Sequence, residues 1–175
     1  MTDSEGASVH ASAVLVGNRA VLIRGPSGAG KSRLAFDLIL AGRAGQIPPA
    51  VLVGDDRVHL DAGNGQLLVR PAPTLAGLIE IRGLGIVRGE FAGEATVGLV
   101  VDLAAADAER LPPPEALVTR IHGVMIPRIP VSVGYAALPL VVAALTMTAS
   151  SSLPHPSADC SKGIGNHISP TIATE

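Results

Sequence analysis

Short apolar runs separated by glycine-containing turns dominate the chain up to residue 103. The run SAVLVGNRAVLI (12–23) predicts two strands joined by the two-residue turn Gly17-Asn18. RVHLDAGNGQLLVR (57–70) predicts a second hairpin around Asn64-Gly65. Because two-residue turns join antiparallel strands, part of the sheet is expected to be antiparallel.

Two further runs are apolar without alternation, which is typical of strands buried on both faces. They are AVLV (50–53), which ends in Asp55-Asp56, and TVGLVVDL (96–103), which carries Asp102 near its end. PAPTLAGLIEIRGLGIV (71–87) lies between them and is rich in glycine.

Helical spacing appears in two segments. Leu34, Leu38 and Ala41 recur at helical intervals in SRLAFDLILAGR (32–43), and Gly42 is the expected C-cap. LPLVVAALTMTA (138–149) predicts the last helix, in which a first-turn proline is tolerated.

Proline marks the irregular parts of the second half of the chain. ADAERLPPPEAL (106–117) is predicted to be an exposed loop. Prolines in IHGVMIPRIPVSV (121–133) remove ladder donors, so this segment is predicted to be irregular or an edge strand. Residues 149–175 show no periodicity and are predicted to form a disordered tail behind one domain, residues 1–148.

Composition narrows the partners that this chain is expected to have. Hydrophobic residues make up 47% and charged residues 16%, which suits a folded core. Aromatic residues make up only 2% and the net charge is −2, so neither a base-stacking platform nor a basic field for nucleic acid is expected. The N-terminus lacks the pattern of a signal peptide, and a cytoplasmic protein is predicted.

The uncharged stretch 129–153 raises the question of a membrane segment. Its densest part contains a proline and is about 15 residues long, whereas a membrane helix needs about 20. The stretch therefore predicts a buried helix and no membrane partner.

A phosphate-binding loop is the clearest chemical motif. The pattern G-x-x-x-x-G-K-[ST] follows an apolar strand and opens a predicted helix, which is the context such a loop requires. Glycines let backbone N–H groups surround phosphate oxygens, the lysine ammonium supplies a compact charge, and the serine hydroxyl suits Mg²⁺. The predicted nucleotide-binding residues are Gly25, Pro26, Ser27, Gly28, Ala29, Gly30, Lys31 and Ser32.

Acidic residues at two strand ends could complete such a site. Asp102 has the position of a metal-orienting carboxylate, and Asp55-Asp56 could supply a general base. For both, a solvated turn acid is the alternative. The Asn-Lys-x-Asp motif of GTPases and the motifs of eukaryotic protein kinases are absent from the sequence.

GPSGAGKSRLAFDLI, LVGDDRV and LIEIRGLGIV, in this order, resemble the catalytic domain of the HPr kinase/phosphorylase family. The segment LIEIRGLGI (78–86) looks like that family's own signature, and the resemblance covers residues 10–148. It implies an α/β P-loop fold with a mixed sheet, similar to HPr kinase and phosphoenolpyruvate carboxykinase. It also implies serine phosphorylation of HPr or an HPr-like phosphocarrier of the phosphotransferase system, by a homo-oligomer that is a hexamer in the family.

The family resemblance also implies the cofactors and their ligands. ATP would lie with its phosphates in the loop around Lys31, and Ser32 and Glu80 would ligate Mg²⁺. Without the resemblance, Glu80 and Arg82 lie two residues apart and could simply pair with each other.

The same resemblance implies that Lys31, His10, Arg110 and the Asp55-Asp56 pair are catalytic residues. One acid of the Asp55-Asp56 pair would be the general base, and it would protonate the departing seryl oxygen in the reverse, phosphate-dependent reaction. His10 would support that acid, and Arg110 would stabilise the transferring phosphoryl group. The residues alone leave open a surface histidine and a solvated loop arginine.

One departure from the family pattern bears on the direction of the reaction. The stretch 130–135, where the family usually has arginines linked to dephosphorylation, contains none, and Arg128 lies close by but displaced. The departure favours kinase over phosphorylase activity. A small-molecule P-loop kinase and an ATP-sensing module without turnover are the two alternative functions.

Overall fold

The structure is a computed structural model that describes residues 7–147. Its main sheet has nine strands, of which seven follow the order β1-β5-β6-β9-β3-β2-β4, and β11 joins β10 to β9. β3 and β11 pair with β9 in parallel, and the other pairs are antiparallel, so the predicted mixed sheet is confirmed. The strands are β1 (Val9–His10), β2 (Ser12–Val16), β3 (Arg19–Arg24), β4 (Ala50–Gly54), β5 (Arg57–Gly63), β6 (Gln66–Pro71), β9 (Ala95–Leu103), β10 (Val118–Ile121) and β11 (Val124–Val131).

Both predicted hairpins are confirmed. β2 and β3 turn at Gly17-Asn18, and β5 and β6 turn at Asn64-Gly65. Asn64 and Gly65 both have positive φ, 51° and 74°, which is the conformation that a two-residue type I′ turn requires.

The helix α1 (Lys31–Arg43) follows β3, but its predicted C-cap is wrong. Gly42 lies inside the helix, where an added Cβ would be 2.7 Å from the backbone nitrogen of Ala50. Gly45, with φ 72°, adopts the left-handed conformation after the helix instead. Gly42 therefore serves the close approach of α1 to β4.

The proline-containing segment forms the strand β11, and each half of it has a neighbouring strand on one side only, so the predicted edge character is confirmed. Its first half pairs with β10 and its second half with β9. Because each half has one ladder partner, Pro127 and Pro130 fit in this strand. The helix α2 (Ala137–Thr146) follows it and holds Pro139 in its first turn, as predicted.

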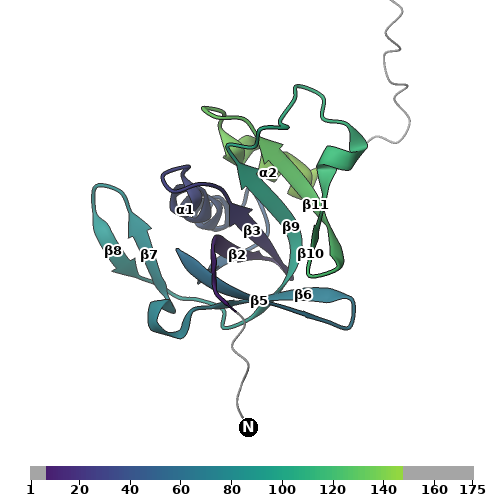
Figure 1. Ribbon diagram of the computed structural model, residues 1–175. Coiled ribbons are helices and arrows are strands. Elements are labelled where there is room, and N and C mark those ends of the chain that lie inside the picture. Colours follow the sequence, from purple (N-terminus) through teal and green to yellow (C-terminus); the bar gives the residue numbers. More distant parts are fainter. Residues whose placement is uncertain (1–6, 148–175) are drawn as a thin grey trace, which may run out of the picture.

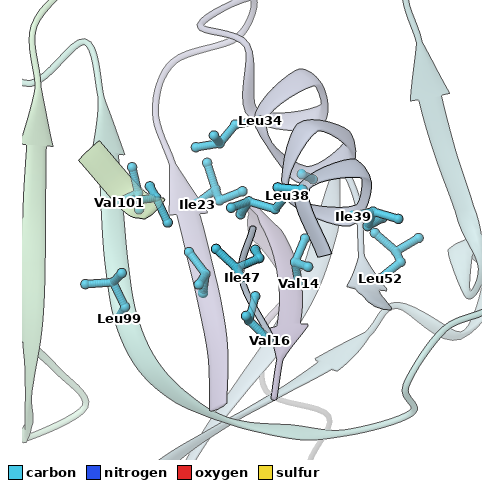
Figure 2. Packing of buried hydrophobic residues seen from close by; sticks show 14 of the residues in the cluster. Val14, Val16, Ile23, Leu34, Leu38, Ile39, Ile47, Leu52, Leu99 and Val101 are labelled. Atoms are coloured by element: carbon cyan, nitrogen blue, oxygen red, sulfur yellow. The ribbon is translucent and has the colours of Figure 1, made fainter. Parts of the chain in front are cut away.

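Apolar side chains pack on both faces of the sheet. On one face, Leu34 and Leu38 of α1 pack with Ile23 and Val101 of the sheet (Figure 2). Val141 of α2 belongs to the same cluster. On the other face, β5 and β6 cover Leu22 and Val100. Fully burying one such side chain stabilises the fold by about 1.5–3 kcal/mol, so this packing holds α1 against the end of β3.

A separate hairpin stands beside α1 (Figure 1). It consists of β7 (Leu78–Ile81) and β8 (Gly85–Arg88), and Ile79 packs into the α1 core. Two short 3₁₀ helices, η1 (Pro73–Leu75) and η2 (Pro114–Leu117), complete the described elements. Within residues 7–147, no helix is long and apolar enough to cross a membrane, and the predicted tail lies outside this range.

Candidate phosphoryl-transfer site

The phosphate-binding loop connects β3 to α1, as the sequence predicted. Gly25 has φ 152°, and a Cβ there would lie 2.9 Å from the carbonyl oxygen of Leu103. The loop backbone therefore packs directly against the end of β9, where a side chain would not fit. Gly30, with φ 96°, is the N-cap of α1, and no side chain caps this helix end. The free N–H groups and the helix dipole therefore favour an anion at this loop.

Lys31 points back into the loop. Its side chain is 6% exposed, and Nζ donates hydrogen bonds to the carbonyl oxygens of Gly25, at 2.9 Å, and Pro26, at 3.0 Å. Burial lowers the pKa of the ammonium below its ordinary value, although the charges of Asp55 and Asp56 oppose this shift.

Asp55 is held in the interior. It is 3% exposed, Oδ1 accepts a 2.6 Å hydrogen bond from the buried Ser12 hydroxyl, and Oδ2 accepts a 3.1 Å bond from the backbone N–H of Glu80. Both carboxylate oxygens are engaged, so Asp55 anchors the hairpin strand β7 to the end of β4.

Asp56 has a different environment from its neighbour. Its side chain is 66% exposed, and Oδ1 lies 3.4 Å from Nε2 of His10 on β1. The backbone takes φ 64°, a left-handed conformation that turns the chain from β4 into β5. The backbone turn at Asp56 therefore directs two adjacent acids to different surroundings, one buried and one facing solvent.

Ser32 and Glu80 offer oxygen ligands for a metal. Ser32 is in the first turn of α1, Glu80 is exposed on β7, and these two elements contact each other. In the described part of the chain, no group of three or more His, Cys, Asp or Glu side chains has metal-binding geometry. Mg²⁺ takes one or two protein oxygens and completes its shell with phosphates and water, so this sparse donor set fits it.

Asp102 belongs to an ion-pair network that the sequence did not reveal. Arg24 binds both its oxygens at 2.7 Å, and Arg128 also binds one of them. Burial raises the pKa of this carboxyl, but the hydrogen bonds from the two arginines outweigh that effect and hold the pKa below its ordinary value. Asp102 is thus neither a solvated acid nor free to orient a metal, because its oxygens are occupied.

Arg110 and Arg82, which the sequence analysis also considered, are exposed. Arg110 lies in the loop after β9, and Arg82 lies in the turn between β7 and β8. Across residues 7–147, Arg110 forms no hydrogen bond or ion pair, and none joins Glu80 to Arg82. The alternative of a simple Glu80–Arg82 pair is therefore not observed.

Removing the charge of Asp102 is expected to destabilise the fold in a pH-dependent way. The Asp102→Asn variant should lose about 2 kcal/mol near neutral pH, because Arg24 and Arg128 keep their partly buried charges. Because the pKa of Asp102 is lowered in the folded state, its ionised carboxylate stabilises the fold at pH values above the ordinary carboxyl pKa of 3.8. This stabilisation is lost as the pH falls through the pKa of the folded state. Urea unfolding of both proteins should show the difference shrinking below that pH. If the difference in unfolding free energy between the two proteins stayed constant in acid, the stabilising role of the ionised Asp102 would be contradicted.

Comparison with known proteins gives consistent matches. The family model for the HPr serine kinase C-terminal domain matches residues 3–158. The HPr kinase/phosphorylase of Mycoplasma mycoides subsp. mycoides SC is 33% identical over 156 residues, which cover 81% of this chain and 48% of that protein. That of Levilactobacillus brevis is 36% identical over 108 residues, which cover 57% of this chain and 32% of that protein. The chain thus spans less than half the length of these relatives.

A solved structure extends the similarity to the fold. The structure of the HPr(Ser) kinase/phosphatase from Coxiella burnetii superposes with a TM-score of 0.62 at 28% sequence identity. The match covers 80% of this chain and 93% of that one. The predicted similarity of the α/β fold to HPr kinase is confirmed.

Proposed function

The chain belongs to the HPr serine kinase C-terminal domain family, and from this membership we propose that it transfers the γ-phosphoryl group of ATP to a seryl hydroxyl of HPr or an HPr-like protein. One observation carries the proposal. Ser12 donates a hydrogen bond to Asp55 and lies in register with Ile23 at the end of β3, so the Asp55-Asp56 pair lies at the end of the sheet where the phosphate loop begins. A base and a phosphate-binding lysine beside each other are what phosphoryl transfer to a hydroxyl needs.

Asp56 is the general base in this proposal. The bond between the γ-phosphorus and the bridging oxygen breaks, a bond from the seryl oxygen to that phosphorus forms, and the seryl proton moves to Asp56. His10, 3.4 Å from the carboxylate, holds it in place. In the phosphate-dependent reaction an oxygen of inorganic phosphate bonds to the phosphorus of phosphoserine, the bond from that phosphorus to the seryl oxygen breaks, pyrophosphate forms, and Asp56 returns the proton to the seryl oxygen.

Asp55 acts as a positioning residue. Both its oxygens accept hydrogen bonds, from Ser12 and from the Glu80 backbone, so it is poorly placed to take a further proton. Its bond to Glu80 fixes the strand that would hold the metal. The geometry thus favours Asp56 over Asp55 as the base.

Charge on the phosphoryl group would be offset from three sides. Backbone N–H groups of the loop 25–32, other than Pro26, and the Lys31 ammonium would receive the phosphates, and Arg110 of the segment after β9 would supply a further positive charge. Ser32 and Glu80 would hold Mg²⁺, which neutralises charge on the phosphates when it is bound.

Kinase activity is the favoured direction. The stretch 130–135 contains no arginine, and Arg128, the nearest one, binds Asp102, Asp107 and the Ala116 carbonyl. Arg128 is therefore committed to the fold and does not replace an arginine that would face inorganic phosphate.

The proposed protein is cytoplasmic and a homo-oligomer, a hexamer by family resemblance. Exposed apolar side chains are consistent with contacts between its subunits. They include Val133 and Tyr135 in the loop before α2 and Leu140 and Met147 at the helix itself. Surfaces of this kind commonly lie in contacts between subunits.

Transfer of labelled γ-phosphoryl from ATP–Mg²⁺ to purified HPr tests the proposal directly. We expect an acid-stable phosphoserine, and no label on an HPr variant whose acceptor serine is replaced by alanine. ATP hydrolysis or phosphorylation of a metabolite without label on HPr would favour a small-molecule kinase. ATP binding without any turnover would favour a sensing module.

A further inference from the structure

Arg128 contacts the segment between β9 and β10 at two points, one before Arg110 and one after it. Its guanidinium binds both oxygens of Asp107, at 2.6 and 2.9 Å, and donates a 2.9 Å hydrogen bond to the carbonyl oxygen of Ala116. Arg110 lies between these two points. One half-buried side chain thus binds the segment on both sides of Arg110.

The same arginine is itself fixed to the strand that precedes the phosphate loop. Arg128 is 13% exposed and shares the Asp102 carboxylate with Arg24, the residue directly before Gly25. Asp102, Arg24 and Pro130 lie in register on adjacent strands, so the sheet aligns this contact. The chain of contacts therefore runs from the phosphate loop to the segment around Arg110.

The segment has few other attachments. The backbone N–H of Ala105 donates to the carbonyl oxygen of Val131 at 2.9 Å, and Ser132 makes a long 3.5 Å bond to the Ala108 carbonyl. Glu109, Arg110 and Leu111 are exposed. Without the grip of Arg128, the exposed part of this loop would be free to take many conformations.

We propose that Arg128 and Asp107 are positioning residues that clamp the loop so that Arg110 faces the phosphate site. The proposal rests on the proposed function, in which Arg110 stabilises the transferring phosphoryl group. A clamp matters for such a group because a displacement of about 1 Å can cost about 10²-fold in rate. The clamp acts on chemistry and not on nucleotide binding, since the loop 25–32 keeps its own contacts.

Asp107→Asn is the main test, with Asp61→Asn as a matched control. Asp61 is an exposed carboxylate that accepts hydrogen bonds from an arginine, Arg70, near the β5–β6 turn. We expect Asp107→Asn to lower kcat for seryl phosphorylation about 10-fold with an unchanged KM for ATP, Asp107→Glu to restore part of kcat, and Asp61→Asn to behave as the unchanged protein. Equal kcat for Asp107→Asn and the unchanged protein would overturn the proposal.

A double variant separates positioning from a general loss of structure. If Asp107 acts through Arg110, adding Asp107→Asn to Arg110→Ala should leave kcat where Arg110→Ala alone puts it. Losses that simply multiply would mean that Asp107 acts independently of Arg110, and the proposal would be wrong.

Limited trypsin digestion tests the clamp without any phosphoryl transfer. Cleavage after Arg110 should be about 10-fold faster in Asp107→Asn, because a released loop can take the extended conformation that the protease needs. Cleavage after Arg82, in the turn of the β7–β8 hairpin, should keep its rate and serves as the internal control. Unchanged cleavage at Arg110 would overturn the clamp even if HPr proved not to be the substrate.

Discussion

Asp56→Asn is expected to slow seryl phosphorylation by about 10²- to 10⁴-fold, the usual contribution of a general base, while ATP binding is kept. The carboxylate of Asp56 is exposed and close to His10, whereas both oxygens of Asp55 accept hydrogen bonds. Asparagine has almost the same shape but cannot accept the seryl proton. Single-turnover transfer to HPr, with nucleotide binding measured separately, gives both quantities.

The choice of asparagine keeps the fold out of this result. Asp56 has φ 64°, and asparagine is among the residues that tolerate the left-handed conformation, so the turn from β4 to β5 should survive. Alanine at this position would add backbone strain and confuse the interpretation.

Asp55→Asn is the comparison that decides between the two acids. Asparagine has one side-chain oxygen in place of the two that accept hydrogen bonds from Ser12 and from the N–H of Glu80, so we expect a loss of about 10-fold, caused by a weaker hold on β7 and not by a missing base. If Asp55→Asn were the more damaging of the two variants, the assignment of Asp56 as the base would be wrong.

Lys31→Met is the second change with a large expected effect. It keeps the buried aliphatic part of the side chain but removes the ammonium that binds the carbonyl oxygens of Gly25 and Pro26. Removing one preorganised hydrogen-bond donor that stabilises charge in the transition state lowers the rate by about 10²- to 10³-fold, so kcat/KM for ATP should fall by at least that much. Titration with ATP and steady-state transfer measure the two contributions.

Lys31→Arg shows whether charge alone is sufficient. The site is 6% exposed and closely surrounded by loop carbonyls, and a planar guanidinium cannot occupy the place of a compact ammonium. We expect Lys31→Arg to be nearly as inactive as Lys31→Met. Activity close to that of the unchanged protein would show that the loop needs only a positive charge.

Several parts of the fold could be predicted because local chemistry determines them. Gly17-Asn18 and Asn64-Gly65 require particular backbone angles, and the two hairpins form where these pairs occur. The phosphate loop from Gly25 to Ser32 is likewise specified by its glycines, its lysine and its place between strand and helix. The family resemblance first drawn from LIEIRGLGI (78–86) is confirmed by the match over residues 3–158.

Other features depend on contacts between distant residues, which a local pattern does not contain. Gly42 looked like a helix cap, but the approach of Ala50 makes glycine necessary inside α1. The prolines of β11 indicated its edge character, but they did not indicate that β10 and β9 would each pair with one half of it. Asp102 was predicted to be a solvated or a metal-orienting acid. Its ion pairs with Arg24 and Arg128 could not be foreseen, because both arginines are far from it in sequence.

The sequence by itself determined the turns, the phosphate loop and the family, because each depends on residues that are neighbours in the chain. Only the tertiary structure decided which of two adjacent acids is buried and which faces solvent beside His10. It also decided that Arg128 binds Asp102 and Asp107, and so holds the loop that carries Arg110. The physical reason is that burial and ion pairing depend on which strands lie side by side, and that arrangement arises only when the whole sheet has formed.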